Sequence, residues 1–242
     1  MNDVIFTALL VGGATIISGA TGLLFRKVNA RLNSCLFSSA AGIMLSASIV
    51  NLILPSAEIG GAFLSTIGIF AGAFLVNAID LFLPYLSFYL GVGRDERWRS
   101  SLLFVLAITM HNLPEGIAAG VGLGAGEGFD GFILAIAIAL QNLPEGIIVT
   151  AAMLDLNAKP ALAFLISAFT GVVEIIGTFV GYFALGISSA LLPLILALAG
   201  GAMLYVICEE LIPECQSTNG DIPNGYFLLA GFSLMLIIDA II

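Results

Sequence analysis

The chain has 242 residues, of which 60% are hydrophobic and 10% are charged, and its mean hydropathy is +1.14. A soluble domain has about 45–50% apolar and about 25% charged residues, so this composition argues against a water-soluble globular fold and excludes disordered, collagen-like and disulfide-rich secreted chains. The formal net charge is −9, and several acidic residues lie inside apolar segments, where an ionisable side chain points to function.

Eight apolar segments are long enough to cross a membrane as helices, because a bilayer core about 30 Å thick requires about 20 apolar residues. The breaks between them are rich in Gly, Pro, Asn and charged residues. The predicted spans are 4–25, 34–54, 60–83, 100–121, 131–153, 161–186, 188–212 and 225–241. We therefore expect an all-α, polytopic membrane protein that forms a single transmembrane domain over residues 1–242.

The basic residues predict the orientation of this domain. All seven lie in loops that follow odd-numbered spans: Arg26, Lys27, Arg31, Arg94, Arg97, Arg99 and Lys159. Because loops rich in Lys and Arg stay in the cytoplasm, both termini are expected outside. Arg26 and Lys27 follow the first span, the reverse of a signal peptide. The compact chain favours a prokaryotic plasma membrane, and its three cysteines are expected near the cytosol as reduced thiols.

The fourth and fifth predicted spans contain a repeated polar motif. Residues 111–116 read HNLPEG and residues 141–146 read QNLPEG, thirty positions later. Each motif begins about ten residues into its span, which is about 15 Å deep and near the bilayer centre. Antiparallel neighbours joined by a short loop would bring the two motifs together at that depth. The alternative is that both are proline-kinked helices without a ligand.

The side chains of these motifs are suited to a divalent metal ion. Residues four apart share one helix face, which pairs His111 with Glu115 and Gln141 with Glu145. Carboxylates that lie close together in a low dielectric repel each other unless a cation offsets the repulsion. Imidazole and carboxylate ligands suit Zn²⁺, Fe²⁺, Mn²⁺ or Co²⁺, bound as one ion or as two. The candidate ligands come from both motifs and the sixth span: His111, Asn112, Glu115, Gln141, Asn142, Glu145 and Glu174.

With these motifs, the chain resembles the ZIP (Zrt/Irt-like) family of divalent metal transporters, and the short bacterial members in particular. The resemblance covers nearly the whole chain. It implies import of zinc, or of iron, manganese, cobalt or cadmium, into the cytosol through a site between spans four and five. It also implies that Glu174 joins this site and that Met44 of span two adds a thioether, although Met44 equally suits core packing.

The resemblance further implies an entrance and an exit for the ion. The entrance residues would be Glu58, Asp239 and Asn51. The exit residues would be Asp80, Glu209 and Glu210. Ordinary solvated helix ends are the alternative interpretation of Glu58 and Asp239.

The chain also departs from the family pattern. Gln141 stands where many members have His, and Asn142 stands where some have Asp, so a second metal position is weakened. His111 is the only histidine in the chain. The family often dimerises, so a homodimer is an expectation that the resemblance adds, together with contact to membrane lipid. No resident cofactor is expected.

Two other functions remain open from the residues. The first is a proton-coupled carrier of small organic solutes, with Glu115, Glu145 and Glu174 as a proton relay. The second is an intramembrane metalloenzyme, in which a bound metal would activate water. We do not expect an enzyme, since a single histidine falls short of the several that such sites use. The few basic residues give no support for nucleic-acid binding.

Overall fold

The computed structural model describes residues 2–24, 30–89, 109, 112–124, 131–187, 189–213 and 224–241. Within these ranges every element is helical and no strand occurs, which confirms the predicted all-α fold. The elements are α1 (Asn2–Gly22), α2 (Ala30–Ala47), η1 (Ser48–Ile53), α3 (Leu54–Tyr89), α5 (Gly131–Asp155), α6 (Pro160–Ile187), η2 (Ser189–Leu191), α7 (Leu192–Val206), η3 (Ile207–Leu211) and α9 (Gly225–Ile241). Residues 112–124 are also helical.

The helices have the length and hydropathy of membrane spans. Five described segments qualify: Asn2–Gly22, Ser34–Ile79, Gly131–Leu154, Pro160–Leu185 and Leu192–Glu209. Apolar side chains cover the outside, and Phe63, Phe70 and Phe74 of α3 are 82%, 71% and 73% exposed. Exposed apolar surface of this kind requires lipid rather than water around it. The protein is a multi-pass membrane protein, while eight spans and outward termini stay predictions.

The connection between α2 and α3 differs from the prediction, which ended one span at residue 54 and began the next at residue 60. The helix instead runs from Ala30 through η1 and past Pro55 as far as Gly60. Pro55 has no N–H to give and crowds the carbonyl of Asn51, and the chain widens into the π-helix η1 there rather than ending. The turn comes at Gly61, where φ is 80° and ψ is 157°.

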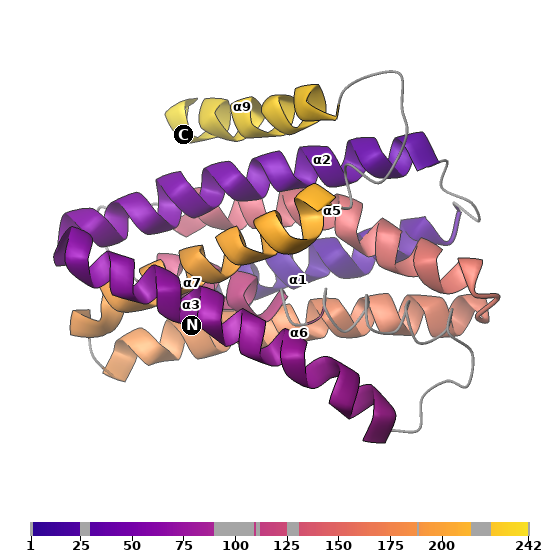
Figure 1. Cartoon of the computed structure of the whole chain (residues 1–242), viewed down its shortest axis with the longest axis horizontal. Helices are drawn as coiled ribbons and strands as arrows, with labels where there is room; N and C mark the ends of the chain where they lie inside the picture. Colours follow the sequence, from indigo (N-terminus) through magenta and orange to yellow (C-terminus); the bar gives the residue numbers. More distant parts are fainter. Residues whose placement is uncertain are drawn as a thin grey trace.

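Most helices run roughly along the long axis of the molecule (Figure 1). By their contacts we divide them into two bundles, and we count α2 and α9 with α3 and α7 because α2 continues into η1, which packs against α7. In the first bundle α1 packs along α5 and α6, and in the second α3 packs along α7 and α2 along α9. Glycines set the close crossings inside each bundle: a Cβ on Gly12 of α1 would lie 2.3 Å from the Gly171 carbonyl oxygen of α6, and one on Gly72 of α3 would lie 2.0 Å from the Leu198 oxygen of α7. Small residues allow such backbone contact in membranes.

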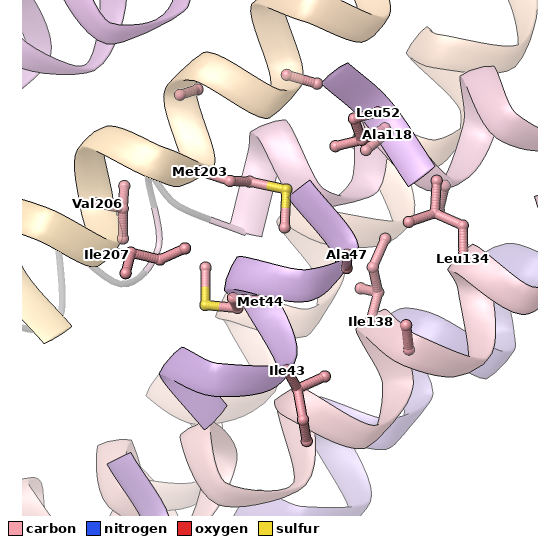
Figure 2. Packing of buried hydrophobic residues seen from close by; sticks show 14 of the residues in the cluster. Ile43, Met44, Ala47, Leu52, Ala118, Leu134, Ile138, Met203, Val206 and Ile207 are labelled. Carbon is pink, nitrogen blue, oxygen red and sulfur yellow. The ribbon is translucent and has the colours of Figure 1, made fainter. Parts of the chain in front are cut away.

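The two bundles meet mainly where α2 packs against α5. This contact is made by apolar side chains of one core, and Figure 2 shows Ala47 of α2 beside Ile138 of α5. Both chain ends lie in the left half of Figure 1, as does the turn between α2 and α3. The polar motifs belong to the first bundle, because Gly116 lies against α6 and Gly146 lies against α1.

Candidate metal site

The fifth-span motif lies in the middle of a continuous helix. Glu145 is 14 residues from the start of α5, which spans Gly131–Asp155, so it sits about 21 Å along the helix axis. Pro144 removes one backbone hydrogen bond without ending the helix. Hydroxyl groups of neighbouring helices donate to backbone carbonyls around this kink. Ser18 Oγ donates to the Asn142 backbone oxygen at 3.0 Å, and Ser167 Oγ donates to the Gly146 backbone oxygen at 3.2 Å. The packed neighbours thus supply the partners that lipid lacks.

Three helices converge on Glu174, which lies halfway along α6. A Cβ on Gly116 would lie 2.1 Å from the Glu174 carbonyl oxygen, so the segment 112–124 touches α6 directly beside Glu115. From α5, Asn142 Nδ2 donates to Glu174 Oε1 at 2.5 Å. The carboxylate of Glu115 interacts electrostatically with those of Glu145 and Glu174. These contacts place Gly116 of the fourth-span motif and Asn142 of the fifth-span motif against Glu174 of the sixth span.

The predicted site residues that the structure describes are almost completely withdrawn from the surface. The exposed fraction is 5% for Glu145 and 0% for Asn112, Glu115, Gln141, Asn142 and Glu174. An ionisable or amide side chain in such a position needs partners, because a buried polar group without one costs about 1–3 kcal/mol. We therefore ask which of these buried polar atoms have a hydrogen-bond partner within the described part of the chain and which have none.

Most of these polar atoms have no hydrogen-bond partner among the described residues. We call these atoms the open polar cluster. They are both carboxylate oxygens of Glu115, Oε2 of Glu145, the amide oxygen and nitrogen of Asn112, the amide oxygen and nitrogen of Gln141, and Oδ1 of Asn142. Glu174 is different, because Oε1 accepts from Asn142 and Oε2 accepts from Thr15 Oγ1 at 2.9 Å. A native protein seldom leaves so many buried groups unsatisfied, and the Gln141 amide is close enough to the Glu115 carboxylate to interact with it. The cluster is therefore a candidate ligand site.

The donor atoms of the cluster are all oxygen or amide nitrogen. Within the described ranges, no three His, Cys, Asp or Glu side chains stand together in a metal-binding arrangement. His111 lies outside the residues that the structure describes. The arrangement can offer two carboxylates and several amide oxygens to a hard or borderline divalent cation.

Met44 lies in the apolar core that the two bundles share. Its side chain is 1% exposed and belongs to the same cluster as Met203 and Val206 of α7, and Figure 2 shows it on α2 near Ile207. These contacts fit the core-packing interpretation. The role of Met44 as a thioether ligand stays a prediction.

The predicted entrance residues lie on three elements of the second bundle. Glu58 is exposed on α3 shortly before the turn at Gly61, and Asp239 is partly exposed near the end of α9. Asn51 lies in η1, and its amide nitrogen has no partner within the described part of the chain. Their roles in admitting an ion stay predictions.

Two of the three predicted exit residues lie in a second π-helix. Glu209 is exposed within η3, which also contains Glu210 and is followed by Pro213. Asp80 is part of α3, and the side chains of Asp80 and Glu210 lie outside the described residues. Sequence reasoning missed both π-helices. Their signal was a proline four residues after Asn51 and after Glu209, since proline crowds the carbonyl at that distance.

Helix α1 also carries site residues that the sequence reasoning missed. Thr15 and Ser18 are 0% and 2% exposed and donate to Glu174 and Asn142. Hydroxyl groups three positions apart on the face of an apolar helix were the available signal. The sequence could not reveal which other helix that face touches.

Fold and site together define a multi-pass helical membrane protein with an unsatisfied cluster of carboxylates and amides at mid-helix. Residues 95–239 match the family described as ZIP Zinc transporter, and the chain belongs to this family. This confirms the resemblance that the repeated motif indicated.

Three relatives illustrate the match. The chain is 34% identical to zinc transporter ZIPB of Bordetella bronchiseptica over 96% of this chain and 80% of the relative. It is 31% identical to zinc transporter ZupT of Escherichia coli over 97% of this chain and 95% of the relative. Identity to zinc transporter GufA of Myxococcus xanthus is 45%, but that match spans only 59% of this chain and 56% of GufA. All three are named as transporters, in agreement with the prediction of a non-enzymatic protein.

Proposed function

We propose that the protein imports a divalent transition metal, with zinc as the main cargo, across the plasma membrane into the cytosol. The observation that carries the proposal is the open polar cluster, which presents buried oxygen atoms that the described fold leaves unsatisfied. The names of the relatives, all zinc transporters, favour zinc within the range of ions that such ligands accept.

The charge of the cluster supports a cation as its ligand. Two carboxylates about 4 Å apart repel by about 4 kcal/mol at an effective dielectric constant of about 20. Glu115 and Glu145 are close enough to interact electrostatically. A divalent cation between them reverses the sign of the interaction, and the predicted ligand His111 would add a nitrogen donor. Asn112, Gln141 and Asn142 would complete the shell with neutral oxygens.

The two bundles offer a means of moving the ion. Close glycine contacts fix the helices inside each bundle, whereas apolar side chains form the contact between α2 and α5. We propose that the first bundle shifts against the second, so that the site opens alternately to the two sides. Glu58, Asp239 and Asn51 would attract the ion outside, and Asp80, Glu209 and Glu210 would release it to the cytosol.

The test is zinc uptake by proteoliposomes that contain the full chain and a zinc-sensitive dye. We expect the wild type to take up zinc and Glu115→Ala to lose uptake while it still inserts, because the substitution removes two oxygens of the cluster. The matched control is Asp3→Ala, since Asp3 is an exposed carboxylate of α1. A panel of iron, manganese, cobalt and cadmium defines the range of cargo.

Two results would reject the proposal. Wild-type protein that inserts but moves none of these ions would exclude metal transport. If calorimetric titration also detects no zinc binding at micromolar concentration, the carrier of organic solutes becomes the better interpretation. Glu115→Ala protein that transports zinc at the wild-type rate would show that the open polar cluster is not the transport site.

A further inference from the structure

Helix α1 supplies three groups to the polar network behind the site. Thr15 Oγ1 donates to Glu174 Oε2 at 2.9 Å, and Ser18 Oγ donates to the Asn142 carbonyl oxygen at 3.0 Å. The Val11 carbonyl oxygen accepts from Asn142 Nδ2 at 3.2 Å. Two long-range side-chain contacts and one backbone carbonyl therefore tie α1 to α5 and α6 at the depth of the motif.

These contacts fix the orientation of the Asn142 side chain. An amide NH₂ group has two hydrogens, and both are used here, one by Glu174 Oε1 and one by the Val11 oxygen. The reversed amide would place its oxygen against two acceptors, so the network itself assigns nitrogen and oxygen. The remaining atom, Oδ1, is buried and has no partner among the described residues. Asn142 therefore presents an oxygen, and not a nitrogen, to the open polar cluster.

Thr15 completes this arrangement from the far side of Glu174. One oxygen of the Glu174 carboxylate accepts a hydrogen bond from the Asn142 amide, and the other oxygen accepts one from the Thr15 hydroxyl. Thr15 is 0% exposed and lies 159 residues from Glu174 in the chain, so its hydroxyl acts only inside the bundle. Without that bond the carboxylate can rotate, and the Asn142 amide loses the partner that keeps its oxygen directed into the cluster.

We propose that Thr15 is a positioning residue of the metal site, which acts through Glu174 to orient Asn142 Oδ1 as a ligand for the ion. The inference rests on the proposed transport function. Partners that orient metal ligands typically change metal affinity by about 10–100-fold when they are removed. Thr15→Val keeps the shape of the side chain and removes the donor, so we expect it to weaken zinc binding about tenfold.

The experiment measures zinc affinity by calorimetry on the purified full chain and the KM and maximal rate of zinc uptake in proteoliposomes. Thr15→Val should raise KM about tenfold, and Thr15→Ser, which restores a hydroxyl, should return KM to within about twofold of the wild type. The matched control is Thr170→Val: Thr170 is equally buried, and its hydroxyl donates to Ser167 on the same helix. Thr15→Ala takes the place of Thr15→Val if the latter is not monodisperse.

A double-mutant comparison shows whether Thr15 acts through Glu174. In a Glu174→Ala background, which has no acceptor for the Thr15 hydroxyl, the added Thr15→Val substitution should have no further effect on zinc affinity. Equal KM values for Thr15→Val and Thr170→Val would overturn the inference, as would a full additional loss in the Glu174→Ala background. In either case Glu115→Ala still tests the transport function separately. Zinc uptake that fails in the wild type would instead refute the proposed function itself.

Discussion

One of the close backbone contacts between the segment 112–124 and α6 lies directly beside a predicted ligand and provides a sharp test of the site. A Cβ placed on Gly116 would lie 2.1 Å from the Glu174 carbonyl oxygen and 2.9 Å from the Glu174 carbonyl carbon. Both atoms belong to the backbone of α6, so no rotation of a side chain can relieve the overlap. The substitution Gly116→Ala therefore has to separate the two helices.

The structure sets the size of that movement. Ordinary contact of a Cβ with a neighbouring atom begins near 3.4 Å, so the helices must move apart by about 1.3 Å at this point. Overpacking of this kind costs about 1–3 kcal/mol, which lowers an apparent melting temperature by about 2–12 °C in a protein of this length. Metal ligands tolerate displacements of only about 0.2 Å, so we expect zinc affinity to fall at least about tenfold as Glu115 moves away from α5 and α6.

The assay compares Gly116→Ala with Gly13→Ala in detergent solution, by thermal unfolding and by zinc titration. Gly13 lies on α1, and an added Cβ there would meet none of the described atoms within 4 Å. Because alanine favours a helix over glycine by about 1 kcal/mol, Gly13→Ala should keep or raise the melting temperature and leave zinc affinity unchanged. A Gly116→Ala protein with wild-type melting temperature and zinc affinity would refute this account of the crossing and of the site beside it.

Two further substitutions test the second bundle. Gly61→Ala should destabilise the protein by about 1–3 kcal/mol, because the φ of 80° and ψ of 157° at Gly61 are accessible almost only to glycine. Thermal unfolding compares this variant with the control Gly225→Ala. Equal melting temperatures of the two variants would contradict the prediction. Tyr205→Phe removes the phenolic oxygen that accepts from Asn77 Nδ2 at 2.5 Å. A membrane hydrogen bond contributes about 0.6 kcal/mol on average, so we expect a small loss of stability with an unchanged KM for zinc, and a raised KM would link this bond to the transport site.

The local features of the fold could be predicted from the sequence. Hydropathy places helices because each apolar run must satisfy its own backbone in lipid, and the repeat of HNLPEG and QNLPEG identified Glu115 and Glu145 as partners. The path of the chain past Pro55 could not be predicted in the same way. A proline can end a helix or widen it, and the choice here depends on the packing of η1 against α7.

The network behind the site could not be predicted for a different reason. Thr15 and Glu174 are 159 residues apart in sequence, and hydropathy does not distinguish a hydroxyl that faces lipid from one that faces another helix. That choice depends on which helices cross and how closely. A glycine marks a place where two helices can cross closely, but the sequence does not say which helix is the partner. Gly12 of α1 and Gly171 of α6 form such a pair, which only the structure shows.

The glycines of the two motifs explain why two nearly identical sequences have different surroundings. Gly116 brings its helix against the backbone of α6 at Glu174, whereas a Cβ on Gly146 would lie 2.1 Å from Ser18 Oγ and 2.4 Å from the Thr15 carbonyl oxygen of α1. Gly146 therefore admits the helix whose Ser18 hydroxyl and Val11 carbonyl bond Asn142, while the equivalent Asn112 has no partner among the described residues. The two copies of the motif thus pack against different helices, and this difference comes from the neighbours of Gly116 and Gly146 rather than from the motif itself.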